Sequence, residues 1–151
     1  MGYPVRGGPR DARGEEGSIL PLTIFYGFLS LVLVLLVVAA TSLYLERKRL
    51  FTLADGAALA GAEAFALEDV LLGAGGPRPR LRSPAVAAAV RDYLATAPSD
   101  IDSLAVERAV TTDGRSATVE LSGYWRPPVL TVFVPAGFRL EVTAVARSVF
   151  F

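Results

Sequence analysis

The stretch between residues 19 and 45 constrains this chain more than any other, because its 27 positions contain no charged residue. As a helix rising about 1.5 Å per residue it would be roughly 40 Å long, and the hydrocarbon core of a bilayer is about 30 Å thick. A chain of this size would hardly bury such a helix on every side. We therefore expect a single transmembrane anchor rather than a buried core helix. A cleaved secretory signal fits less well, since its apolar region is usually about 7–15 residues long.

The segments on either side of the span do not orient it. The positive-inside rule compares the basic residues that flank a span. Here three cations stand on each side: Arg6, Arg10 and Arg13 before it, and Arg47, Lys48 and Arg49 after it. The tail, residues 1–18, is rich in Gly, Pro and Arg, so we expect it to be disordered. The chain has no cysteine, which excludes disulfides but leaves the compartment of the C-terminal part open.

The composition argues against catalysis and against nucleic-acid binding. The chain has 15 cationic and 15 acidic residues and so no basic excess for a phosphate backbone. Histidine and cysteine, which are common general bases and zinc ligands, are both absent. The Gly-Ala-Gly-Gly run at residues 73–76 precedes Pro77 rather than a helix with Lys and Ser/Thr, so it fails as a phosphate-binding loop. We expect no enzyme, no cofactor, no metal, no small-molecule substrate and no nucleic-acid partner.

Beyond the span, residues 46–72 are predicted to continue the same helix. Ala, Leu and Glu are frequent there, and no proline occurs between Leu22 and Gly76. Apolar residues recur at three- and four-residue steps and so share one face; they are Leu50, Phe51, Ala54, Ala57, Ala58, Gly61, Phe65 and Leu72.

Small residues on this helix are spaced for close packing. The pairs Ala54/Ala58 and Ala57/Gly61 have the spacing that lets two backbones approach. The helix either packs only on its own domain, or packs one face on its own sheet and another face on other subunits. Asp55 lies among these residues, as a solvated charge or as the partner of a cation in this domain or in a neighbour.

The C-terminal part, residues 73–151, is predicted to be a small α+β domain. A loop from Gly73 to Arg82 precedes a helix from Ser83 to about Thr96, with Ser83 as N-cap and Pro84 in the first turn. The apolar stripe of this helix is Val86, Val90, Tyr93 and Leu94.

Alternating patterns then predict an antiparallel sheet of three to four strands. Residues 104–110 and 116–123 alternate around Asp113-Gly114, a strong two-residue hairpin signal. This turn would pair Val110 with Ala117 and Val106 with Leu121, and it would set Glu107 opposite Glu120. After Arg126-Pro127-Pro128, residues 129–134 are a short apolar run, either a strand or a membrane-proximal segment. Residues 138–150 form the last strand, with Phe138, Leu140, Val142, Ala144 and Ala146 facing inward.

Three stretches together resemble the TadE/TadG-like proteins of tight-adherence (Flp-type) pilus assembly. They are EEGSILPL at residues 15–22, YLERKR at residues 44–49 and ADGAALAGA at residues 54–62. The Asp-x-Ala-Ala-Leu-Ala-Gly-Ala run is the most specific part, and the resemblance covers about Arg13 to Phe65. The run TAVARS near the C-terminus is also similar to the tail of that family.

This resemblance implies a pilin-like fold and a structural role. The chain would be a minor pilin-like or pseudopilin-like, single-pass component of a tight-adherence pilus or a related secretion system. Its N-terminus would be cytoplasmic, and residues 46–151 would be extracytoplasmic. Its partners would be the membrane and other pilus or secretion-system subunits. The alternative is a bitopic membrane protein whose small outer domain binds a partner or ligand as an accessory or sensor subunit.

The resemblance also points to Gly17-Ser18 as a candidate processing site. Processed members of such pilin-like families carry a Gly at the cleavage point and a Glu five residues into the mature chain. Gly17 stands just before the span, but the fifth residue after it is Leu22. We expect the tail to stay uncleaved.

Overall fold

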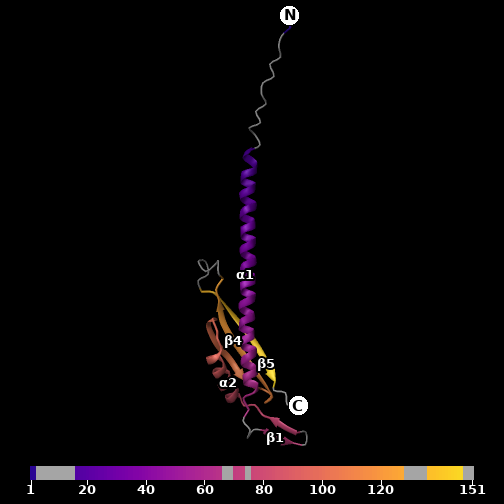
Figure 1. The fold of residues 1–151 in the computed structure, drawn as a ribbon, viewed down its shortest axis with the longest axis vertical. Helices are drawn as coiled ribbons and strands as arrows, with labels where there is room; N and C mark the ends of the chain where they lie inside the picture. Colours follow the sequence, from indigo (N-terminus) through magenta and orange to yellow (C-terminus); the bar gives the residue numbers. More distant parts are fainter. Residues whose placement is uncertain (3–15, 66–69, 74–75, 128–135, 148–151) are drawn as a thin grey trace. The chain divides into compact units, whose positions relative to one another are not determined.

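A computed structural model describes residues 1–2, 16–65, 70–73, 76–127 and 136–147 (Figure 1). The chain divides into two compact units, Met1–Val38 and Ala39–Phe151. Helix α1, Glu16–Ala62, contributes to both. The α+β fold predicted from the sequence is confirmed: a long apolar helix, a second short helix and a three-stranded antiparallel sheet.

The first unit contains the N-terminal half of α1. Its apolar side chains, among them Ile24, Phe28 and Leu33, are exposed. One helix among the described residues is long and apolar enough to cross a membrane, judged by its length and composition, with a mean hydropathy of 2.7 over its most apolar window. The predicted tail lies mostly outside the described residues, which omit residues 3–15.

The second half of α1 ends at Ala62, ten residues before the predicted end at Leu72. The Ala64 N–H donates to the Gly61 carbonyl at 3.3 Å, an i→i−3 bond that tightens the last turn. Residues predicted to be helix and loop form a hairpin instead, in which β1 (Val70–Gly73) pairs with β2 (Gly76–Pro79). Helix propensity is a weak prior that tertiary context overrides, and Val and Leu before a glycine-rich stretch of sequence also suit a strand.

Helix α2, Ser83–Thr96, is where the sequence predicts it, with Pro84 in the first turn. The N-cap is Arg82 rather than Ser83. The Ser83 hydroxyl instead accepts from the Thr111 N–H and donates to the Thr111 carbonyl, both at 3.2 Å. Ser83 therefore connects the start of α2 to the end of the next strand. Its partner Thr111 is 28 residues away, and capping rules consider only neighbouring residues.

The main sheet has the order β3-β4-β5, all antiparallel: β3 is Asp102–Val110, β4 is Ser116–Trp125 and β5 is Phe138–Arg147. Strands β4 and β5 pair without interruption from Ser116↔Arg147 to Trp125↔Phe138. Residues 129–134, predicted as a strand or a membrane-proximal segment, lie outside the described residues.

The predicted register of β3 against β4 is correct at Val106↔Leu121 and wrong nearer the turn, where Val110 pairs with Thr118. The register shifts between Val106 and Arg108, so Glu107 is an extra residue on β3. Arg108 therefore faces Glu120, with its Nε 3.2 Å from the Glu120 Oε2. The predicted repulsion between Glu107 and Glu120 does not arise.

The displaced Glu107 finds two partners of its own. Its Oε1 accepts from the Ser122 hydroxyl at 2.6 Å and lies 2.9 Å from Nη2 of Arg139 on β5. The bulge thus converts a like-charge contact into a hydrogen bond and an ion pair that link β3 to both other strands.

The core lies between the sheet and the two helices, which share one face of it. Buried residues from α1, α2, β4 and β5 belong to one cluster: Leu50, Leu53, Ala54, Ala57, Ala58, Ala62, Leu81, Val86, Val90, Ala117, Val119, Leu121, Val142 and Ala144. The predicted stripe of α2 faces this core, with Val86 and Val90 buried and Tyr93 and Leu94 packed against it. On β5 the predicted inward residues Val142 and Ala144 are buried, whereas Phe138 is exposed.

The connection between β3 and β4 spans residues 111–115 and is wider than the predicted two-residue turn. The Asp113 Oδ1 accepts from the N–H groups of Arg115 at 2.8 Å and Ser116 at 2.7 Å, and Gly114 adopts a φ of 68°. The Ser116 hydroxyl donates to the Asp113 Oδ2 at 2.9 Å. An aspartate that bonds the backbone two residues ahead followed by a left-handed glycine stabilises such a turn.

We expect Asp113→Ala to destabilise the fold at neutral pH. The backbone N–H of Arg115, followed by the donors of Ser116, lowers the pKa of Asp113 to about 2. Because the pKa of Asp113 is lower in the folded chain than its unfolded value of about 3.9, the carboxylate stabilises the fold fully at pH values above about 3.9. This contribution is lost as the pH falls toward about 2. The difference in unfolding midpoint between wild type and variant should therefore be constant above about pH 5 and shrink below it.

The matched control is Asp92→Ala, because Asp92 is exposed on α2 and its carboxylate accepts no hydrogen bond from the described residues. Its pH profile should follow that of the wild type. A gap for Asp113→Ala that persists unchanged down to pH 2 would show that the carboxylate does not hold the turn.

Candidate assembly surface on helix α1

The small residues of α1 face the core of their own unit. Ala54, Ala57 and Ala58 are fully buried, and Gly61 is buried with them. A Cβ at Gly61 would lie 3.0 Å from the Val86 Cγ1 and 3.2 Å from the Ala117 Cβ. Within this chain the elements that approach Gly61 closely are α2 and β4.

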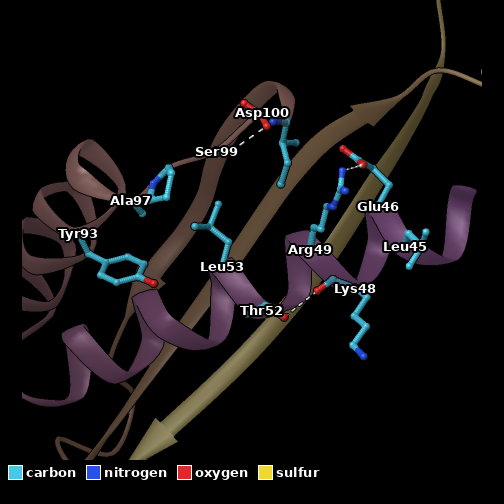
Figure 2. A pocket seen from close by; sticks show the side chains of 12 residues that line it. Leu45, Glu46, Lys48, Arg49, Thr52, Leu53, Tyr93, Ala97, Ser99 and Asp100 are labelled. Carbon is cyan, nitrogen blue, oxygen red and sulfur yellow. Dashed lines mark hydrogen bonds and ion pairs between the residues drawn. The ribbon is translucent and has the colours of Figure 1, made fainter.

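Gly56 also allows a close approach between helices, which the spacing of small residues did not predict. A Cβ at this position would overlap the hydroxyl of Tyr93 on α2. Figure 2 shows the Tyr93 ring pointing from α2 to α1. Gly56 falls outside the pairs Ala54/Ala58 and Ala57/Gly61, and the signal that was available is a glycine next to Asp55 in a run of mostly small residues.

The opposite side of α1 is exposed. Five exposed residues at steps of three or four define what we call the outer face: Tyr44, Lys48, Phe51, Asp55 and Leu59. Asp55, the one charged candidate from the sequence, is on this face and not in the core. No described residue provides an ion-pair partner for either Asp55 or Lys48. The outer face therefore combines three large apolar side chains with two unpaired opposite charges.

A groove of about 600 Å³ runs beside the outer face, between α1 and the connection from α2 to β3 (Figure 2). Leu53 points into it from α1, Tyr93 lines it from α2, and Ala97 lines it from the position just after α2. On its rim Arg49 lies 3.6 Å from Glu46, and the Ile101 N–H donates to the Ser99 hydroxyl at 3.3 Å. The lining is apolar with both signs of charge at the rim, and it holds no convergent set of polar groups that would select a small molecule.

The described residues contain no group of three or more His, Cys, Asp or Glu side chains that could hold a metal ion. The pKa that is clearly shifted among these residues, that of Asp113, belongs to a turn and not to a cleft.

The candidate processing site lies at the start of α1, where the backbone of Gly17 and Ser18 is helical from Glu16 onward. The structure does not describe their side chains. It places these two residues 36 or more positions before Ala54 in the same helix, so the processing candidates and the packing candidates form two separate places on the chain.

Comparison with known proteins bears on α1 alone. No curated protein and no solved structure matches this chain. One family model matches, over residues 17–64, and these residues are α1 with the turn that follows it. The resemblance expected over about Arg13 to Phe65 is thereby confirmed for that stretch, while the likeness of the C-terminal run TAVARS stays a prediction. Residues 17–64 of this chain match the family model Tad, which is described as "Putative Flp pilus-assembly TadE/G-like".

Proposed function

We propose that this chain is a structural component of a Flp-type pilus or a related secretion system, held in the membrane by a single pass of α1. The observation that carries the proposal is the coincidence of the family match, residues 17–64, with α1, Glu16–Ala62. The stretch that matches the family model is thus a helix. Its N-terminal half is apolar, and its C-terminal half packs against α2 and the sheet.

The role within that system is minor pilin-like or pseudopilin-like. The tail before the span is retained in this proposal. In support, Gly17 and Ser18 are part of a helix, whereas proteolytic cleavage favours exposed flexible segments, and Leu22 stands where processed pilin-like chains have Glu. A chain that keeps its tail suits an anchored assembly factor.

The orientation places the N-terminus in the cytoplasm and residues 46–151 outside it. A reporter enzyme fused after Phe151 is expected to be active on the extracytoplasmic side, and the same reporter fused before Gly17 on the cytoplasmic side. Family resemblance supports this orientation, because the three cations on each side of the span leave the charge rule undecided. Activity of the C-terminal fusion in the cytoplasm would contradict the proposal.

The outer face of α1 is the proposed contact with other subunits. Apolar side chains such as Phe51 and Leu59 gather there and are left uncovered by the described residues, as is typical of interaction surfaces. Lys48 and Asp55 are seven residues apart, about 10 Å along the helix axis, so Lys48 of one copy would meet Asp55 of a second copy that is shifted by that distance along the axis, as between successive subunits of a filament.

The proposed contact on the outer face can be tested by isolating the chain together with its partners. When the tagged chain is isolated in mild detergent from its native membrane, pilus platform proteins or further copies should accompany it. Asp55→Lys and Lys48→Asp should each reduce the recovery of copies, roughly fivefold if a surface ion pair of about 1 kcal/mol is lost per contact. The combination of both changes should restore part of it, because the pair is reversed and not removed.

Asp92→Lys is the matched control, since it makes the same charge change at an exposed position on α2. It should leave recovery unchanged. Equal recovery for wild type, Asp55→Lys and Lys48→Asp would remove the outer face as the contact. Recovery of a receptor or a ligand-binding partner in place of pilus components would favour the accessory or sensor function.

A further inference from the structure

The apolar stretch is longer than a bilayer requires, and one hydrogen bond ties its last part to the sheet. The Trp125 Nε1 on β4 donates to the Ser42 Oγ on α1 at 3.1 Å. Ser42 is three residues before Leu45, the last residue of the uncharged stretch. From Ile19 to Thr41 there are 23 residues, about 34 Å of helix, which is close to the hydrocarbon thickness of about 30 Å.

Aromatic residues gather at this level of the second unit. The Trp125 ring is 9% exposed and lies 6.0 Å, centroid to centroid, from the ring of Phe138 on β5. Phe138 is 52% exposed and Tyr44 on α1 is 64% exposed. We call Tyr44, Trp125 and Phe138 the aromatic end. Large exposed apolar rings are costly in water, whereas aromatic rings are enriched in the headgroup layers of membranes.

A second groove beside the aromatic end has a composition that suits lipid. It measures about 480 Å³ and lies between α1 and β5. Ala40, Leu43 and Leu140 form its apolar part, and Tyr44, Arg47, Arg139 and Glu141 form its polar part. Arg139 also bonds to Glu107 and Glu141, at 2.9 and 3.0 Å, so the charges of the groove nearly cancel. Burial of rings and acyl chains, and not net charge, is therefore the attraction that this region offers.

We propose that the aromatic end rests in the lipid headgroup layer of the membrane that α1 crosses, so that the hydrocarbon boundary lies next to Ser42. The inference depends on the membrane anchoring proposed above. It does not depend on the direction of α1 within the membrane, because Trp125 is bonded to Ser42 and must share its depth. Ser42 itself belongs to the uncharged stretch that is proposed to cross the membrane, so the bilayer is the occupant that this proposal names.

The chain carries its own probe, because Trp125 is its single tryptophan. The full chain is reconstituted into vesicles whose phosphatidylcholine carries bromine either high or low on the acyl chains, and tryptophan fluorescence is compared with that in unlabelled vesicles. We expect clear quenching that is at least twofold stronger with the shallow bromines than with the deep ones. Flotation of the vesicles measures anchoring in the same samples.

The outcomes separate the two proposals. If the chain floats with the vesicles and neither lipid quenches Trp125, the lipid contact of the aromatic end is refuted and the anchor stands. If deep bromines quench more strongly, the sheet is immersed and the boundary is not at Ser42. If the chain does not float, anchoring and lipid contact are both refuted.

A pair of variants on β5 tests the contact from the other side. Phe138→Glu should reduce shallow quenching by half or more, because a carboxylate at the aromatic end opposes burial in the headgroup layer. Val145→Glu makes the same kind of change at a residue that is 61% exposed, seven positions or about 23 Å further along the strand. It should leave quenching as in the wild type. Equal quenching for wild type and both variants would overturn the role of Phe138 in holding the aromatic end to the membrane.

Discussion

Gly61→Leu is expected to unfold the Ala39–Phe151 unit at temperatures where the wild type is stable. A first side-chain carbon at this position would already lie 3.0 Å from the Val86 Cγ1, 3.2 Å from the Ala117 Cβ and 3.4 Å from the Val90 Cγ2. Leucine adds three more carbons in a space filled from α2 and β4. Overpacking of this kind costs about 1–3 kcal/mol or more, against a total stability of about 5–15 kcal/mol for a typical domain.

Thermal unfolding of the full chain in detergent, followed by circular dichroism, measures the effect. Gly27→Leu is the matched control, because Gly27 belongs to the same helix and a Cβ there meets nothing within 4 Å. Both changes gain the same helix propensity, about 1 kcal/mol, so the difference between them isolates the packing. A variant at Gly61 as stable as the variant at Gly27 would mean that α2 and β4 do not approach α1 as closely as the structure places them.

The sequence was informative where a pattern is local and repeated. The uncharged stretch from residue 19 to residue 45 predicted the apolar half of α1, and a proline in the first turn with an apolar stripe predicted α2 at Ser83–Thr96. Alternation located β4 and β5, because burial on one face of a sheet leaves a period of two in the sequence. These features need no knowledge of a distant partner.

The sequence failed where a distant partner decides the structure. The bulge at Glu107 depends on Ser122 and on Arg139, which is 32 residues further along the chain. Ser83 was expected to cap α2, but its hydroxyl forms hydrogen bonds with the backbone of Thr111 instead. The sequence predicted that α1 ends at Leu72, but it ends at Ala62, a position at which helix propensity alone predicts no helix end. The first two errors arose from local rules that a tertiary contact overrides.

The assembly surface was half predictable for the same reason. Small residues at positions 54, 57, 58 and 61 led us to predict a close approach, since their spacing is a property of the helix. Spacing cannot say whose backbone approaches, and the structure assigns that place to α2 and β4 of the same chain. The position of Asp55 on the outer face becomes clear only once the core is known. The residues that the sequence grouped together are therefore of two kinds: four small residues buried in the core and one exposed aspartate.

Leu50→Ala is the second change from which we expect a large effect. Leu50 is 1% exposed and belongs to the core between α1 and the sheet, and its Cδ1 would be in ordinary van der Waals contact, at 4.0 Å, with a Cβ at Gly123 of β4. The side chain therefore fills part of the core between α1 and the sheet. Removing it takes away buried carbons and leaves a cavity, which together cost about 2–5 kcal/mol for a buried leucine.

Leu59→Ala tests whether the loss comes from burial, since Leu59 lies on the same helix nine residues later and is exposed on the outer face. The two changes have the same effect on helix propensity, and an exposed site usually changes stability by less than about 0.5 kcal/mol. Thermal unfolding in detergent should therefore show a large drop in midpoint for Leu50→Ala and almost none for Leu59→Ala. In the isolation of tagged chains the order should reverse for variants that still fold: Leu59→Ala should weaken the recovery of copies, because its side chain belongs to the proposed contact and not to the core. Equal stability losses for both variants would contradict the division of α1 into a core face and an outer face, and with it the surface through which this chain is proposed to assemble.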